Sequence, residues 1–220
     1  MKLPLLSFLF LLLYSSLCNA QRLAPFGSET NKLEYGERVN RIPYDASVSY
    51  FECIDSGSTF IRHENEKEFY TLYFFIDDSL SEIGLRVLSP VPELTSPNKG
   101  HFATEEFYNS KNRNKGFNTF VSLTKAGTIK NRSDLSDFKK EPEWFIIGQN
   151  DDSKEMDNPE NSLFRVMNGK NNIYLSPGLY RIRISSSEIN KESLIGSFLL
   201  QIGAIPAAPL SPLVSDWRKL

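Results

Sequence analysis

One segment of the chain gathers acidic side chains, and it is the best candidate for binding a ligand. Residues Gln149–Glu160 hold five acids and one lysine. The acids are Asp151, Asp152, Glu155, Asp157 and Glu160. Hard cations such as Ca²⁺ bind oxygen atoms, which carboxylates, hydroxyls and carbonyls supply. The segment therefore has the chemistry of a calcium site, and the alternative interpretation is a solvated acidic loop at the edge of a sheet.

The spacing of these acids differs from that of an EF-hand. An EF-hand loop has glycine at its sixth position and a glutamate that binds through both oxygens at its twelfth. Counted from Asp151, the sixth residue is Met156 and the twelfth is Ser162. The segment is therefore not an EF-hand.

Residues suited to hydrolytic catalysis are sparse. The two histidines are His63, inside a charged run, and His101, in a loop with glycine and proline, and we expect both at the surface. The patterns Gly-x-Ser-x-Gly, His-x-His and His-Glu-x-x-His do not occur in the sequence. Nothing in the linear sequence places two carboxylates across a cleft, as a glycosidase requires. The sequence therefore favours a protein that is not an enzyme.

Residues 1–20 have the features of an export signal. Lys2 supplies a positive start. Leu3–Leu17 is an apolar run of fifteen residues, shorter than the roughly 20 needed to span a bilayer. The residues after this run are compatible with two kinds of processing. Signal peptidase could cut after Ala20, or Cys18 could be the lipid-acceptor cysteine of a bacterial lipoprotein.

The charge balance of the mature chain argues against nucleic acid as a partner. Residues 1–20 contain one lysine and no acid, which leaves 24 basic and 27 acidic residues and a net charge of −3. Binding to nucleic acid requires a basic face. Once Cys18 is removed or acylated, Cys53 is left without a disulfide partner. We expect Cys53 to be a small buried residue, and the exported chain depends on its hydrophobic core.

Short apolar strands separated by turns dominate the chain after residue 45. The densest is Glu68–Asp77, whose aromatic residues are typical of a strand packed on both faces near the middle of a sheet. The alternating strand Ile83–Leu88 follows it. The other predicted strands are Ala46–Ile54, Phe117–Lys125, Trp144–Ile147, Leu163–Met167, Asn171–Leu175, Leu179–Ser185 and Ile195–Ala204. Strands at this spacing predict an all-β fold, a β-sandwich or jelly roll.

Only a few short helical turns are expected, all of them in loops. Thr104 offers an N-cap hydroxyl, and Glu105 and Glu106 place acids in a first turn. Ser133–Lys139 has the residues for one or two further turns, capped by Ser133. We expect residues 21–45 to form a tether or an edge segment, residues 46–215 a single β-sandwich domain, and residues 216–220 a short tail.

Four blocks of the sequence resemble, in the same order, the major surface lipoprotein family of Leptospira. The first, Phe69–Glu93, is similar to the signature hairpin of that family and contains the matching motif Ile83–Pro90. The others are Asn161-Ser162-Leu163-x-Arg165, Gly178-Leu179-Tyr180-Arg181-Ile182, and Gly196-Ser197-Phe198 through Ser211-Pro212-Leu213. Together the blocks cover most of Ala46–Ser215. On these residues the chain is identified as a divergent member of the family.

The resemblance implies a jelly-roll lipoprotein of the outer membrane, anchored by lipid on Cys18 and exposed at the cell surface. It also implies binding of host extracellular-matrix proteins such as laminin, collagen and fibronectin. Cleavage at Ala20 would instead give a periplasmic or secreted protein. A structural envelope lipoprotein without adhesive function is the alternative role. The chain ends at Leu220, so any adhesion by the long Lys/Glu-rich helix at the family's C-terminus does not carry over.

A calcium site is also implied by the resemblance. The family forms it from an Asp-Thr pair in a strand, an aspartate run in a following loop, and a tyrosine before its Asn-Ser-Leu motif. This chain has Asn118-Thr119 as the strand pair, Asp151-Asp152 in place of the run, and Glu160 in place of the tyrosine. The implied calcium ligands are therefore Asn118, Thr119, Asp151, Asp152 and Glu160. Asn118 removes one formal charge, and Glu160 adds one.

Overall fold

The computed structural model describes residues 48–58, 61–64, 67–93, 95, 97, 101–136, 140–151, 161–186, 193–205 and 213–220, with strands β1 (Leu33–Glu34) and β2 (Glu37–Arg38). β1 and β2 pair antiparallel as a small separate sheet. The predicted export signal, with Cys18 and Ala20, lies outside the described residues, as does most of the predicted tether. In the part that is described, no helix has the length and apolar character needed to cross a membrane.

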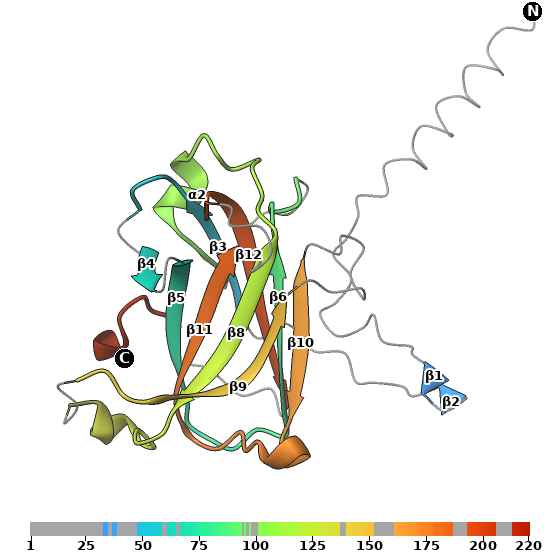
Figure 1. Cartoon of the computed structure of the whole chain (residues 1–220), viewed down its shortest axis with the longest axis vertical. Helices are drawn as coiled ribbons and strands as arrows, with labels where there is room; N and C mark the ends of the chain where they lie inside the picture. The colour runs from blue at the N-terminus through green and yellow to red at the C-terminus, as the bar shows by residue number, and fades with distance from the viewer. Residues whose placement is uncertain are drawn as a thin grey trace, which may run out of the picture.

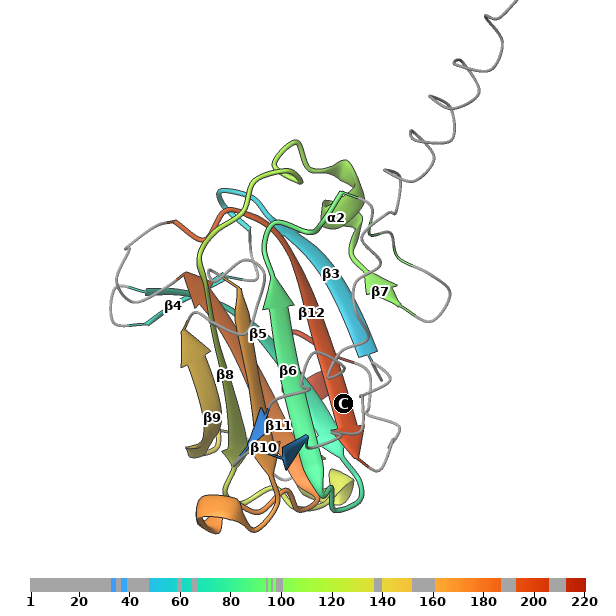
Figure 2. The same ribbon diagram turned by 90° about the vertical axis from the view of Figure 1, so that its right-hand side faces the viewer.

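Ten further strands form two sheets that pack face to face (Figures 1 and 2). The front sheet faces the viewer in Figure 1 and has the order β4 (Ile61–Glu64), β5 (Lys67–Ile76), β11 (Gly178–Ser186), β8 (Thr119–Ala126) and β9 (Trp144–Asp151). The back sheet has the order β10 (Ser162–Met167), β6 (Glu82–Leu88), β12 (Gly196–Ile205), β3 (Val48–Ile54) and β7 (Phe102–Ala103). All neighbours are antiparallel except β3 and β7, which are parallel.

The order of the long strands is that of a jelly roll. β3, β12, β6 and β10 are neighbours in the back sheet, while β5, β11, β8 and β9 are neighbours in the front sheet. The first long strand, β3, therefore pairs with the last, β12. A jelly roll has this arrangement, in which two Greek keys form two packed sheets. The predicted all-β sandwich is confirmed.

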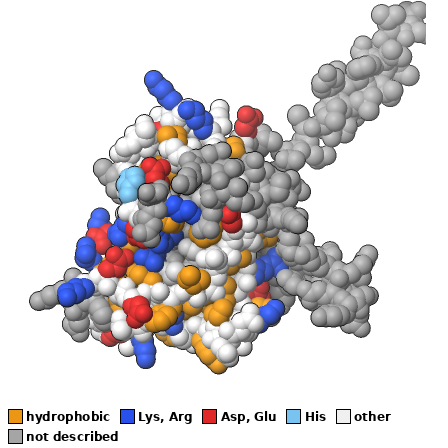
Figure 3. Space-filling model, viewed as in Figure 1, with side chains coloured by type: hydrophobic (Ala, Val, Ile, Leu, Met, Phe, Trp, Pro, Cys, Tyr) orange, Lys and Arg blue, Asp and Glu red, His pale blue; other side chains and the backbone are white. Residues whose placement is uncertain are grey.

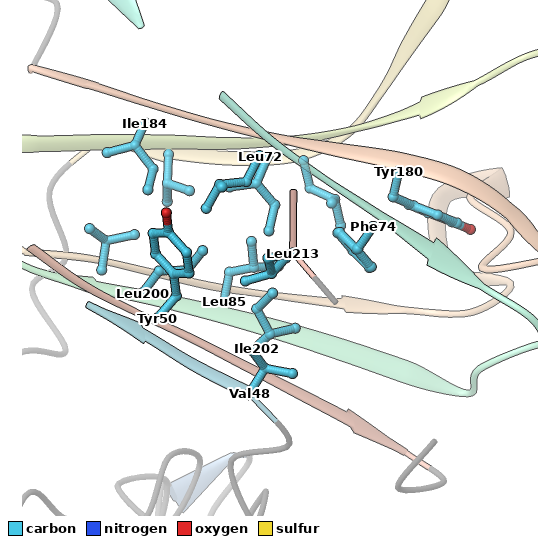
Figure 4. Packing of buried hydrophobic residues seen from close by; sticks show 14 of the residues in the cluster. Val48, Tyr50, Leu72, Phe74, Leu85, Tyr180, Ile184, Leu200, Ile202 and Leu213 are labelled. Carbon is cyan, nitrogen blue, oxygen red and sulfur yellow. The ribbon is translucent and has the colours of Figure 1, made fainter. Parts of the chain in front are cut away.

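One hydrophobic cluster fills the space between the sheets (Figure 4). Alternate residues of the long strands point into it, because side chains of a strand alternate between the two faces. Its labelled members are Val48, Tyr50, Leu72, Phe74, Leu85, Tyr180, Ile184, Leu200, Ile202 and Leu213. Each such side chain contributes roughly 1.5–3 kcal/mol of hydrophobic stabilisation. Burial between the sheets is what fixes the register of the strands.

β5 and β6 confirm two predicted strands but correct their relation. The resemblance to the family's signature hairpin implied that the two strands pair with each other, and this was wrong. β5 pairs with β4 and β11 in the front sheet, whereas β6 pairs with β10 and β12 in the back sheet. The connection between them crosses from one sheet to the other. Two apolar strands that follow each other in the sequence can pair as a hairpin or enter opposite sheets. In either arrangement their apolar side chains are buried, so the pattern does not distinguish the two.

The outer face of β5 is covered by residues near the C-terminus. The Tyr73 N–H donates to the Val214 carbonyl over 2.7 Å, and the Val214 N–H donates back to Tyr73 over 3.0 Å. The single 3₁₀ turn η3 (Trp217–Lys219) then buries Trp217 in a second apolar cluster with Tyr73 and Phe75. This second cluster explains why the sequence of β5 is apolar on both faces.

Both predicted helical turns lie where the sequence placed them. Helix α2 (Glu105–Asn109) is capped by Thr104, whose hydroxyl accepts a hydrogen bond from the Phe107 N–H over 3.2 Å. A 3₁₀ helix, η1 (Arg132–Ser136), occupies most of the second predicted site. Its start is held by the carboxylate of Asp134, which accepts from two backbone N–H groups. Ser133 lies inside this 3₁₀ helix, so it is not the cap that was predicted.

The predicted strand Asn171–Leu175 was wrong. The 3₁₀ turn η2 (Lys170–Asn172) occupies its first part. Asn171 and Asn172 have φ angles of 56° and 59°, in the left-handed region that asparagine tolerates better than most residues. A backbone with these φ angles cannot join a β-ladder. The consecutive asparagines in the sequence were the signal for such a turn.

Candidate metal centre

The ends of β8 and β9 bring two predicted calcium ligands to one face of the front sheet. β9 runs to Asp151, beyond the predicted end at Ile147, because β8 gives it a pairing partner along its whole length. Asp151 therefore lies in a strand, directly opposite Phe120. Side chains two residues apart in a strand share a face. Asn118, just before β8, thus lies on the side of Phe120 and Asp151.

The side-chain oxygens of Asn118 and Asp151 have the environment of cation ligands. Both Oδ1 atoms are buried. The Oδ1 atom of Asn118 has no hydrogen-bond partner among the described residues. A buried polar atom without a partner costs about 1–3 kcal/mol. A hard cation at this place would relieve that cost, and oxygen ligands are what calcium prefers.

Thr119 is not brought together with these two side chains. Its hydroxyl is fully buried and donates to the Ser162 hydroxyl over 2.9 Å. The Ser162 hydroxyl in turn donates to the Thr119 carbonyl over 2.6 Å. These bonds join β8 to β10 across the sandwich, on the face opposite to Asn118. The side chain of Thr119 is therefore engaged in holding the two sheets together.

The other predicted ligands, Asp152 and Glu160, lie outside the described residues. Within the residues that are described, no three His, Cys, Asp or Glu side chains gather as a metal-binding group. Asn118 and Asp151 alone are too few for calcium, which takes six to eight oxygen ligands in typical sites. The two described oxygens fit a hard cation, and the rest of the ligand set stays a prediction.

The sequence reasoning missed a group of buried hydrogen bonds formed by Ser89, Asn161 and Ser197, which we call the polar clasp. The Ser89 N–H donates to the Asn161 side-chain oxygen over 2.9 Å. The Ser89 hydroxyl donates to the Ser197 carbonyl over 2.7 Å and accepts from the Phe117 N–H over 3.0 Å. The Ser197 hydroxyl donates to the Arg113 carbonyl over 2.6 Å. The clasp thus ties the ends of β6, β10 and β12 to the segment before β8.

Three of the four blocks that carry the family resemblance meet in the polar clasp. Ser89 belongs to the first block, Asn161 to the second and Ser197 to the last. Gly196 lies beside it with a φ of 138°, and a Cβ atom there would be 2.4 Å from the Lys115 carbonyl oxygen. The signal in the sequence was the recurrence of small polar residues and glycine at strand ends. Their role is to hold loops close to the core.

A buried carboxylate, Glu52, was also missed. It is 1% exposed and accepts hydrogen bonds from the hydroxyls of Tyr50, Tyr70 and Thr104, and from the Cys53 N–H. Burial raises the pKa of Glu52, while the bonds from Thr104, Tyr70 and Cys53 act in the opposite direction. All of these partners lie in strands or in the cap of α2, so we interpret Glu52 as a structural residue. Cys53 itself is buried and free, as predicted.

Comparison with known proteins supports the assignment that the blocks suggested. A search of curated proteins finds no match. A model of the family named Lipl32, described as a surface lipoprotein of the Spirochaetales order, matches residues 38–210. The match spans all the strands of the two packed sheets. The chain therefore belongs to this family of spirochaetal surface lipoproteins.

Proposed function

We propose that this protein is a non-enzymatic lipoprotein of the outer membrane, anchored through Cys18, which holds a calcium ion and binds host matrix proteins. Membership of the surface lipoprotein family supports the location. Both histidines are exposed, and the buried carboxylate Glu52 is enclosed by structural partners. These features are in keeping with a role in binding.

The calcium part of the proposal depends on one observation, the buried Oδ1 atom of Asn118, on the same face of the sheet as Asp151. Asn118 and Asp151 would supply two ligands, and Asp152 and Glu160 follow from the family resemblance. Bound calcium would offset the negative charge of the carboxylates. On the protein side, Asn118 and Asp151 would orient their oxygens toward one point because β8 and β9 hold them in register.

The calcium site is tested by thermal melting with and without Ca²⁺. Ligand at about 100 times its Kd stabilises the folded state by roughly 2.7 kcal/mol. The melting temperature is the readout, because Trp144 begins β9 and Asp151 ends it, so the indole is remote from the site. Asn118→Asp restores a formal charge and should tighten binding, whereas Asn172→Asp, at an exposed position away from the site, should not. A melting curve that is unchanged at millimolar Ca²⁺ would rule the site out.

Matrix binding is tested separately, by surface plasmon resonance with residues 21–220 over laminin, collagen and fibronectin. Saturable binding above that of a matched lipoprotein is expected. Its absence for all three proteins would favour the alternative role, a structural envelope lipoprotein without adhesive function.

The anchor is tested by mass spectrometry of the mature N-terminus. An acylated Cys18 is the expected result. A mature chain that begins at Gln21 would show cleavage after Ala20 and would make the protein periplasmic or secreted. Surface labelling of intact cells then distinguishes the two faces of the membrane.

A further inference from the structure

A groove crosses the outer face of the front sheet, and the proposed function does not use it. Its volume is about 550 Å³, and it extends from Glu64 on β4 to Ile146 and Gln149 on β9. Figure 3 shows this face of the molecule, where basic and acidic side chains lie interspersed beside hydrophobic ones. Among the described residues, its lining includes three cations, Lys67, Arg181 and Arg183, and one acid, Glu64.

The cations of the groove are held in place by aromatic rings. The distances to the ring centre are 4.3 Å for Arg181 over Trp144, 3.5 Å for Arg183 over Phe69 and 5.5 Å for Lys67 over Phe120. Arg181 is fixed further, because its Nε atom donates to the Thr124 hydroxyl over 3.1 Å. Stacking of this kind attracts a cation to the ring face and restricts its orientation. The guanidinium groups are therefore ordered before any ligand arrives.

Each arginine already holds a glutamate carboxylate at the rim of the groove. Arg181 contacts Glu141 over 3.2 Å, and Arg183 contacts Glu64 over 2.8 Å. The side chains of the arginines are only 9% and 15% exposed, whereas those of the glutamates are 46% and 47% exposed. Ion pairs with such an exposed partner contribute little to stability. Carboxylates of a ligand could therefore replace those of the rim.

The spacing and the apolar wall of the groove define the ligand further. Arg181 and Arg183 lie two residues apart on β11 and share a face, which separates them by about 7 Å. Side chains two residues apart in an extended peptide have the same separation. Ile146 lines the groove and is 64% exposed, so an apolar side chain of the ligand would find a contact there. A densely sulfated sugar chain would leave that contact unused.

We propose that the groove of the front sheet binds an extended acidic peptide segment, in which carboxylates two residues apart contact Arg181 and Arg183 and an apolar neighbour contacts Ile146. The two rim glutamates show that each arginine accepts a carboxylate of this kind. The inference goes beyond the proposed function, because it requires neither calcium nor a matrix protein. Its failure would leave those proposals standing.

Fluorescence anisotropy of the full mature protein with a short labelled peptide of alternating glutamate and valine tests the proposal. Binding is expected, and it should weaken as salt rises because exposed charges are screened. Arg183→Gln and Arg181→Gln should each lower the affinity by about tenfold or more, since hydrogen bonds to charged groups are the strong ones. Glu64→Gln should raise the affinity several-fold, because it removes a competing carboxylate. A gain of this kind cannot come from unfolding.

Arg132 provides a matched control outside the groove. It also stacks on an aromatic ring, Phe75, and pairs with an acid, Asp77. Arg132→Gln should leave peptide binding unchanged. Absence of binding, or equal binding by the Arg183→Gln and Arg132→Gln variants, would overturn the proposal. Tighter binding of a heparin-derived oligosaccharide than of the peptide would also overturn it, and would assign the groove to sulfated sugars.

Discussion

The polar clasp and the groove hold polar groups in opposite ways. In the clasp, small side chains are buried and bonded to the backbone of distant segments, and no charge is involved. In the groove, long charged side chains lie on aromatic rings and are paired with exposed carboxylates. The clasp consists of residues that mark the family, and the groove draws on both kinds: Phe69 and Arg181 lie inside the family blocks, whereas Lys67 and Arg183 lie outside them. The comparison teaches that buried neutral hydrogen bonds tie distant segments of the scaffold together, whereas the charges of the groove stay where a ligand can exchange for their partners.

The largest expected effect is at the clasp, for Gly196→Ala. Gly196 has a φ of 138°, and the added Cβ would meet the Lys115 carbonyl oxygen at 2.4 Å. Strained backbone and the clash with main-chain atoms together should cost on the order of 3 kcal/mol or more. Urea denaturation measures the loss. Gly57→Ala is the control, because Gly57 also has a positive φ, 88°, but nothing within 4 Å of its Cβ position. Equal losses for the two variants would show that contact with Lys115 is unimportant.

A smaller loss is expected for Asn161→Ala, which removes one bond of the clasp. The Ser89 N–H would lose its acceptor while it stays buried. An orphaned buried donor costs about 1–3 kcal/mol. Gln149→Ala, at an exposed position in the groove, should change stability by less than about 0.5 kcal/mol. If both variants melt at the temperature of the wild type, the clasp does not stabilise the fold.

In the groove, Arg183→Gln should affect stability less than any change in the clasp. Arg183 loses its ion pair with Glu64, but Glu64 is 47% exposed. The expected loss is below about 1 kcal/mol. Differential scanning calorimetry of Arg183→Gln beside Asn161→Ala makes the comparison direct. A larger loss from Arg183→Gln would mean that the groove, too, is part of the scaffold.

The smallest effect is expected for Asp77→Asn, which removes a surface ion pair outside both regions. Arg132 donates two hydrogen bonds to Asp77, over 2.8 and 2.9 Å, and they lower the pKa of its carboxyl. The folded-state pKa is below the unfolded one, so the pair stabilises the protein above the ordinary aspartate pKa of about 3.9 and loses this effect as the pH falls through the lowered value. Both side chains are more than 40% exposed, so the loss at pH 7 should be under about 0.5 kcal/mol. Melting curves of variant and wild type should converge at acid pH, and a constant difference would argue against the ion pair as its cause.

The strands were predictable because each one carries its own pattern. The alternation of Tyr180, Ile182 and Ile184 with Arg181 and Arg183 placed β11 correctly, with the two arginines on the outer face. Pairing was a different matter. β5 and β6 were expected to be neighbours and lie in opposite sheets, since both are apolar on two faces and local pattern does not identify the partner strand. Register and sheet membership arise from contacts between segments far apart in the chain.

The candidate sites were predictable only in part. Asn118 and Asp151 were paired by the family resemblance, and the register of β8 and β9 places them on one face. The groove could not be foreseen, because Trp144, Phe69 and Arg183 lie on three strands that come together only in the folded sheet. The hydrogen bond between Ser89 and Ser197 could not be predicted either. Serine is common at strand ends, and its local sequence does not show whether it bonds to a distant segment.

The position of β12 between β3 and β6 has a consequence for how the chain acquires its fold. β3 and β6 do not pair with each other. The back sheet therefore lacks its connecting strand until β12, which ends at Ile205, pairs with both. Closing the back sheet therefore joins residues separated by most of the chain, and topologies dominated by such distant pairings fold slowly. As synthesis proceeds, the growing polypeptide stays without its closed sandwich until the final long strand emerges. Slow, late closure of this kind would keep the chain open during passage through a narrow export channel.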